Sequence, residues 1–374
     1  MLCCLAYNYL TYYLVENGYT AFSAGLYIAL FSLFAALIQP LIGNLSDNYP
    51  FFNWKNLLYI FSFILLIIFI ILLFNRTYAG LLMGLFLFCI SIMIPLTNSA
   101  CFAYNSEKHN INYGIARAAG SLAYASCAFI MGKLTLNLGK DVVIKAALII
   151  DVLFIICLFI MPYTSFTKKE KEEKTKFNIS FIKRYPDFFI YILGMTLVYS
   201  FQLISSTYLI QIVTSRGGNS SDMGFISSLS AYLEIPLMFT VSFFIKKFSS
   251  RRLLLISAIC FTVKAFLYYL TNNLAGLYLA QLIHPFCFVF FMGVIVYYSD
   301  ERMADKDKVT GQMCAGAIAT LATFIGSLLG GYIYDKSGIS ALLLCGVILT
   351  VSGLILVIFS QYYEKKLSSQ TVSR

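Results

Sequence analysis

A few ionisable side chains interrupt long apolar stretches of this 374-residue sequence. They are Arg117, Asp151, Glu234, Lys264 and His284. At the centre of a membrane helix a charged side chain costs roughly 2.5–3.5 kcal/mol on insertion scales, so such residues mark pathways for ions and solutes. A buried carboxylate beside a cation or an imidazole can take up and release a proton. These residue types therefore predict proton-binding and ion-pair chemistry inside a membrane.

Glu234 lies in the middle of the apolar stretch 222–245, two residues before Pro236. Proline removes a backbone hydrogen bond and bends a helix, which frees a carbonyl nearby. We expect the Glu234 carboxylate to bind and release a proton. The alternative is a structural role, either as an ion pair with Lys264 or as a hydrogen bond to His284.

Arg117 lies one turn into the stretch 114–137. Its planar guanidinium suits bidentate bonding to sugar hydroxyls or to a carboxylate. The alternative is that the side chain extends to the cytoplasmic interface, where its charged head stays in water and has no role in binding.

Three further ionisable residues each have two interpretations. His284 follows Gln281 by one helical turn, and it is either a functional group or a satisfied polar residue of the interior. Lys264 is either part of the same functional network or only an ion-pair partner. Asp151 is either functional or a residue of pairing or assembly.

The elements that position these residues are apolar segments of helix-spanning length. The chain is 60% hydrophobic and 12% charged, whereas soluble domains have about 25% charged residues. Long apolar runs in lipid form helices, because each backbone polar group must be satisfied within its own segment. We therefore predict an all-α membrane protein with twelve transmembrane helices, at about 2–15, 22–43, 56–74, 79–104, 114–137, 142–162, 188–212, 222–245, 252–271, 274–298, 311–334 and 340–361. The first is short of the roughly 20 residues that a span needs, so either aromatic polar residues complete it or the sequence begins late.

Charge bias in the loops predicts the orientation. Lys and Arg gather in one alternate set of loops, which includes the run from Lys168 to Arg184, and this set is expected to be cytoplasmic. Both termini are then cytoplasmic, in the cell (inner) membrane. The net charge of +10 follows from these loops and does not indicate nucleic-acid binding. The ten cysteines show no metal or disulfide spacing, and we expect no cofactor.

The chain divides into two similar halves around a hydrophilic stretch. We predict a six-helix half at 1–163, a cytoplasmic linker at 164–187 and a second six-helix half, with a short cytoplasmic tail, at 188–374. Gly25 and Gly224 open corresponding helices 199 residues apart. Halves related in this way place a substrate site between them near the membrane midplane.

The segment from Gln39 to Asp47, with Gly43 four residues before Asp47, resembles the helix 2–3 signature of the major facilitator superfamily. We expect Gly43 to let two helices approach closely and Asp47 to accept hydrogen bonds at the cytoplasmic end. The segment 48–55 departs from the full signature, which continues with glycine and basic residues. The resemblance implies the superfamily's twelve-helix fold with two pseudo-symmetric halves.

Within that superfamily the chain resembles the lactose-permease-like oligosaccharide/proton symporters and their phenylpropionate-transporter relatives. The similar segments are 31–47, 113–120 and 281–284. The resemblance places Arg117 at the family's sugar-binding arginine, His284 at its coupling histidine and Lys264 near an essential arginine. The chain also departs from the pattern: the family's proton-carrying glutamate of helix 10 falls at Cys287, so the proton path must differ.

These features predict a secondary active transporter that imports a sugar or glycoside together with a proton. We expect Glu234, Lys264 and His284 to couple the ion, and the substrate to bind Arg117, Asn98, Tyr199, Gln202 and Gln281. An aromatic or organic acid substrate, drug export and a non-transporting sensor are the alternatives. No nucleotide-binding or nucleophile motif is present in the sequence, so we expect no enzyme. We expect a monomer whose partners are the saccharide, protons and the lipid bilayer.

Overall fold

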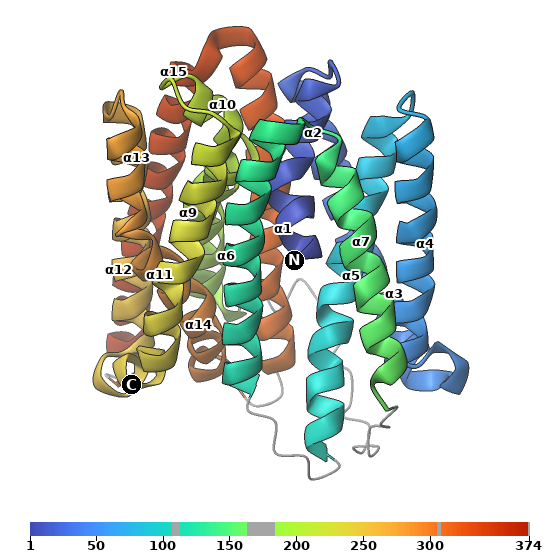
Figure 1. Cartoon of the computed structure of the whole chain (residues 1–374). Helices are drawn as coiled ribbons and strands as arrows, with labels where there is room; N and C mark the ends of the chain where they lie inside the picture. The colour runs from blue at the N-terminus through green and yellow to red at the C-terminus, as the bar shows by residue number, and fades with distance from the viewer. Residues whose placement is uncertain (107–112, 163–183, 305–307, 373–374) are drawn as a thin grey trace. The chain divides into compact units, whose positions relative to one another are not determined.

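The computed structural model describes residues 1–106, 113–162, 184–304 and 308–372, and the ordered elements in these ranges are helices (Figure 1). Most of the predicted linker, and the side chains of Asp47 and Arg117, lie outside the described part. The helices are α1 (Leu2–Cys4), a π-helical turn (Leu5–Tyr9), α2 (Leu10–Glu16), α3 (Ala21–Asn48), a 3-10 turn (Pro50–Phe52), α4 (Trp54–Phe74), α5 (Ala79–Ser106), α6 (Tyr113–Leu138), α7 (Val142–Ile160), α9 (Pro186–Thr207), α10 (Leu209–Thr214), α11 (Ser220–Lys247), α12 (Ser250–Leu270), α13 (Leu274–Gln281), α14 (His284–Arg302) and α15 (Lys308–Val372).

The first helical segment joins α1, the π turn and α2 without a break. It ends at a left-handed glycine, Gly18, whose φ is +87°, a conformation that favours glycine. Thr20 then caps α3 by accepting a hydrogen bond from the backbone N–H of Ser23. The short first segment predicted from the sequence is therefore followed at once by the second helix.

Ten helices within the described ranges are long and apolar enough to cross a membrane. The last of them, Gly311–Tyr363, has 53 residues and contains Gly338 with φ +78° and ψ −171°. That non-helical residue divides α15 into two apolar segments. The protein is an all-helical membrane protein, while the count of twelve spans and the cytoplasmic position of the termini stay predictions.

The chain forms two compact units. The first comprises Met1–Glu170, Ser206–Ala231 and Ser327–Lys336, and the second comprises Lys171–Ser205, Tyr232–Gly326 and Ser337–Arg374. These units cross the sequence boundaries that we predicted for the two halves, because α10 and parts of α11 and α15 pack within the first unit. The division into two six-helix halves stays a prediction.

Glycines set the close packing of the first unit. A Cβ on Gly132 of α6 would lie 2.9 Å from the Cα of Gly224 on α11. A Cβ on Gly25 of α3 would lie 2.2 Å from the backbone oxygen of Ser327 on α15. Gly25 and Gly224, which are matched in the sequence, thus each sit at a close helix contact.

Gly43, where we expected two helices to approach closely, has no close neighbour among the described atoms. A Cβ on Gly43 would meet no described atom within 4 Å, and its role in the motif stays a prediction. The contact between α3 and α5 instead uses Gly80 and Gly84 of α5, whose missing side chains make room for the rings of Tyr27 and Phe31. Large rings of α3 therefore fill the space against α5, and the glycines needed for it lie on α5.

In the second unit α12 packs along α14, and α9 packs against α15. The Ser257 hydroxyl on α12 donates to the backbone oxygen of Cys287 on α14 over 2.6 Å. Gly194 of α9 and Gly353 of α15 meet closely, since a Cβ on Gly194 would lie 2.9 Å from the oxygen of Gly353. These contacts hold α9, α12, α14 and α15 around the polar residues described next.

Candidate functional site

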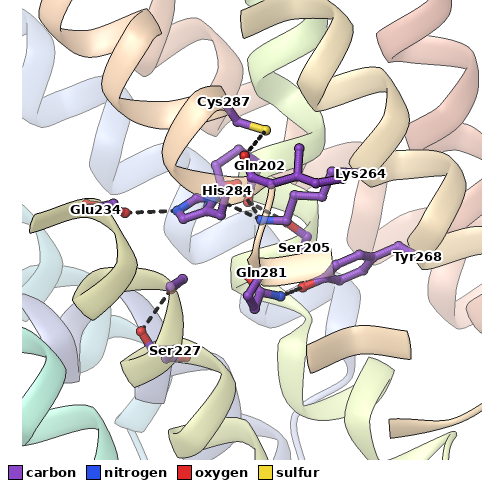
Figure 2. A network of polar contacts seen from close by, with 11 residues as sticks. Gln202, Ser205, Ser227, Glu234, Lys264, Tyr268, Gln281, His284 and Cys287 are labelled. Atoms are coloured by element: carbon purple, nitrogen blue, oxygen red, sulfur yellow. Dashed lines mark hydrogen bonds and ion pairs between the residues drawn. The ribbon is translucent and has the colours of Figure 1, made fainter. Parts of the chain in front are cut away.

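Three ionisable residues of the second unit come from three different helices and meet in its interior (Figure 2). Glu234 lies on α11, Lys264 on α12 and His284 at the first position of α14. Their exposed fractions are 8%, 2% and 4%. The sequence singled out all three, and the structure brings them into one cluster.

His284 stands between the other two. Its Nε2 lies 2.9 Å from Oε1 of Glu234, and its Nδ1 lies 2.9 Å from Nζ of Lys264. The Lys264 ammonium also donates to Oε1 of Gln202 on α9 over 3.4 Å. The imidazole ring thus links Glu234 to Lys264 through one polar contact on each nitrogen.

A break between α13 and α14 positions the histidine. α13 ends at Gln281, and Pro285 occupies the first turn of α14, where its missing N–H costs no helical hydrogen bond. The ring of His284 stacks on Phe288 one turn later, with centroids 5.8 Å apart and an interplanar angle of 21°. Packing on Phe288 and the two polar contacts together fix the orientation of the ring.

Two arrangements of protons satisfy both contacts of His284. In one, the charged Lys264 donates to Nδ1, and Nε2–H donates to the ionised Glu234. In the other, a protonated Glu234 donates to Nε2, and Nδ1–H donates to a neutral Lys264. The proton count is the same in both, since an imidazole accepts at one nitrogen while it donates at the other. The cluster can therefore interconvert a charged Lys264–Glu234 pair and a neutral one without gaining or losing a proton.

One further proton changes the total charge of the cluster from zero to +1. That proton can reside on Glu234 while Lys264 stays charged, or on the ring of His284. A charge without a partner is costly in the membrane interior. Proton uptake thus creates a demand for a new acceptor or anion beside Lys264.

Tyr268 joins the cluster from α12, and the sequence analysis missed it. Nε2 of Gln281 donates to the Tyr268 hydroxyl over 2.7 Å, and Nζ of Lys264 lies 5.6 Å from the centroid of the Tyr268 ring. Residues four apart on a helix share a face, so the spacing of Lys264 and Tyr268 was the available signal. Gln281 is 1% exposed and bonds to Tyr268, while its predicted contact with the substrate stays a prediction.

Tyr199 and Gln202 lie three residues apart on α9. The Tyr199 ring lies 4.8 Å from that of Phe291 and meets Phe261 edge-on at 6.0 Å. These ring contacts bury Tyr199, whose exposed fraction is 7%. Tyr199 and the amide of Gln202, which contacts Lys264, lie on one helix of the second unit, and their contact with a substrate stays a prediction.

The other predicted residues are not part of this cluster. Asn98 lies on α5 in the first unit and is half-buried. Arg117 belongs to α6, and its side chain lies outside the described residues. In the part of the chain that the structure describes, no three His, Cys, Asp or Glu side chains form a metal-binding group.

Comparisons with known proteins place this chain in a family. The model of a protein family described as "MFS_1 like family" matches residues 2–344. An uncharacterized transporter of Bacillus subtilis (strain 168), YwbF, is 24% identical over 283 residues, which are 74% of this chain and 68% of YwbF. A crystal structure of a mutant of the nucleoside transporter NupG matches with a TM-score of 0.79 at 14% identity, covering 96% of both chains.

A second crystal structure of NupG matches with a TM-score of 0.74 at 13% identity and the same coverage. Identities this low show a shared fold, and the family match spans most of the chain. The helices, the buried ionisable cluster and the family match agree with one another. The chain belongs to the MFS_1 like family and is a membrane transporter of the major facilitator type.

Proposed function

We propose that this protein is a proton-coupled symporter that imports a sugar or glycoside by alternating access. The observation that carries the proposal is the line of contacts from Glu234 through His284 to Lys264. A buried carboxylate held by an imidazole and an ammonium can exchange a proton with small rearrangements of its partners. Glu234 is the proton-binding group in this proposal, and His284 transmits its charge state to Lys264.

Gln202 connects the proton site to the solute. Its side-chain oxygen contacts Lys264. The same helix carries Tyr199, whose ring packs on Phe291 and is proposed to contact the sugar. Sugar hydroxyls donate and accept hydrogen bonds, so a bound sugar can take over both Gln202 and the ammonium. When Glu234 is protonated, Lys264 needs such an acceptor. The solute and the proton therefore favour each other's binding.

Arg117 and Asn98, from the first unit, complete the proposed substrate set. We propose that they bind sugar hydroxyls from α6 and α5, the helices that carry them. Arg117 keeps its assignment from the resemblance of residues 113–120 to the sugar symporters. Gln281, which donates a hydrogen bond to the Tyr268 hydroxyl, is the remaining member of this proposed substrate set.

The direct test is the pH outside energy-starved cells that express the protein, after addition of single solutes. The panel holds sugars, other glycosides including nucleosides, and aromatic acids. Proton-coupled import makes the medium alkaline with one class of glycoside. Glu234→Gln should abolish this signal, because an amide cannot bind and release a proton.

Glu301→Gln is the matched control. Glu301 belongs to the same unit, where its carboxylate accepts from the Ser250 hydroxyl at 2.7 Å and has no contact with the cluster. The control should retain the alkalinisation. Equal loss in both variants, or no response to any glycoside with the protein present in the membrane, would count against the proposal.

A second candidate is the import of an aromatic or organic acid. The buried ammonium of Lys264 is the observation that favours it, since an anionic solute would neutralise the +1 charge of the protonated cluster. Alkalinisation with acids alone would select this candidate. Lys264→Gln should then abolish transport of the acid, whereas a sugar transporter should retain solute exchange at a lower affinity.

A further inference from the structure

Asp151 is a buried carboxylate that the proposed transport site does not use. It lies in the middle of α7 within the first unit and has an exposed fraction of 0%. On the same helix Leu153 and Phe159 are 55% and 81% exposed, as expected for a helix with one face toward lipid. The carboxylate therefore points to the protein side of an apolar helix.

The surroundings of Asp151 come from two neighbouring helices. Ser62 of α4 lies beside the carboxylate, and Cys89 of α5 is close enough to interact with it. Both are buried, with exposed fractions of 0% and 2%. Among the described residues, neither oxygen of Asp151 makes a hydrogen bond, and the Ser62 hydroxyl makes none either.

Among the described residues, no charged side chain donates a hydrogen bond to the Asp151 carboxylate. The ammonium of Lys133 on α6 lies over the ring of Phe129 at 4.5 Å, and that of Lys55 on α4 donates to the backbone oxygen of Met161. On the π-helical turn that also packs on α7, the hydroxyls of Tyr7 and Tyr9 bond to Ser91 and to the backbone oxygen of Ala128. The Cys89 thiol is a titratable group that interacts with Asp151. An ionised Asp151 would therefore be a buried charge without compensation, which is far more costly than the neutral acid.

We propose that Asp151 is a second proton-binding site of this transporter, separate from Glu234 and located in the first unit. The proposed site is neutral when the proton is bound, which suits its apolar surroundings. The acid O–H can donate to the Ser62 oxygen after a small movement of either side chain.

The neighbours of Asp151 suit both of its protonation states. A serine hydroxyl accepts from a carboxylic acid and donates to a carboxylate by rotating about one bond. The Cys89 thiol can add a weak donor to the carboxylate. A site built only to pack a neutral acid has no need of rotatable donors on two helices, so we infer that the proton on Asp151 exchanges.

The test uses the purified full chain in detergent with no solute, so its result is independent of the proposed transport activity. Infrared difference spectra between acidic and alkaline buffers report protonated carboxyl groups by their C=O stretch. We expect a band that disappears as the buffer is made alkaline, that is lost in Asp151→Asn and that remains in Glu234→Gln. Ser62→Ala should shift its frequency, because the polar hydroxyl beside the acid is removed.

A second measurement needs no variant. A lipid-soluble carbodiimide adds to a protonated carboxyl group: the acid oxygen bonds to the central carbon, and the acid proton moves to nitrogen. Mass spectrometry of the labelled wild-type chain should find the adduct on Asp151, with less labelling at alkaline pH. A band that does not titrate, labelling that is independent of pH, or an unchanged spectrum in a folded Asp151→Asn would each overturn the proposal.

Discussion

Glu234 and Asp151 are both buried carboxylates within apolar helices, yet their surroundings are opposite. Glu234 has an imidazole at 2.9 Å and, through it, an ammonium. Asp151 has a serine and a cysteine nearby and makes no hydrogen bond among the described residues. The first carboxylate has a basic group in direct contact, whereas the second has only uncharged neighbours among the described residues. The same side chain can thus lie in two electrostatically different surroundings within one chain.

This difference has an energetic counterpart. Burying the charges of the Glu234 cluster costs desolvation free energy, and contacts among four side chains offset this cost. The stability that each member contributes therefore depends on the other members. Asp151 depends on no partner, and its neighbours do not depend on it. Substitutions at the two sites should therefore differ in size and in additivity.

The largest effect is expected when the cation of the cluster is removed. Lys264→Met leaves His284 and Glu234 without their positive partner, and we expect the free energy of unfolding to fall by roughly 3–5 kcal/mol. The double variant with Glu234→Gln should lose less than the sum of the two single variants, because both remove the same interaction. Thermal unfolding in detergent measures both quantities. Additive losses would mean that the imidazole does not couple Glu234 to Lys264.

A smaller effect is expected at Asp151. Asp151→Ala removes a buried polar group for which no hydrogen bond is described, and this gain offsets the cost of the small cavity that it leaves, so stability should change by less than about 1 kcal/mol. Glu234→Ala, the same truncation in a paired carboxylate, should destabilise the protein as Lys264→Met does. The measurement is again the unfolding temperature of the purified variants. A marked loss of stability in Asp151→Ala would show that the carboxyl group has a structural partner.

The two sites also differ in how far the sequence could predict them. An ionisable residue in an apolar stretch is visible in the sequence, and all of Glu234, Lys264, His284 and Asp151 were identified in this way. The contacts were not predictable to the same degree, because they depend on where helices end. The break before His284 places its ring between Glu234 and Lys264, whereas the sequence allowed a direct ion pair between them as well.

Helix contacts show the same limit. The apolar pattern predicted the helical segments well, since spans in lipid require continuous backbone hydrogen bonding. It did not predict which glycine makes a close contact. Gly43 stood in a recognised motif, but Gly80 and Gly84 of α5 receive the rings of α3. A glycine in a sequence shows where a side chain is missing, and only the partner helix shows whether that space is used.

A small predicted effect on stability tests whether the Tyr268 hydroxyl belongs to the Glu234 cluster. Tyr268→Phe keeps the ring beside the Lys264 ammonium and removes only the hydroxyl that accepts from Gln281. We expect a loss of about 1 kcal/mol in unfolding free energy, the usual net value of one hydrogen bond. Tyr269→Phe is the matched control, since Tyr269 is 37% exposed and should change stability little. If Tyr268→Phe instead approached the loss in Lys264→Met, the hydroxyl would belong to the charged cluster, and Gln281 would have to be counted among the groups that hold its charge.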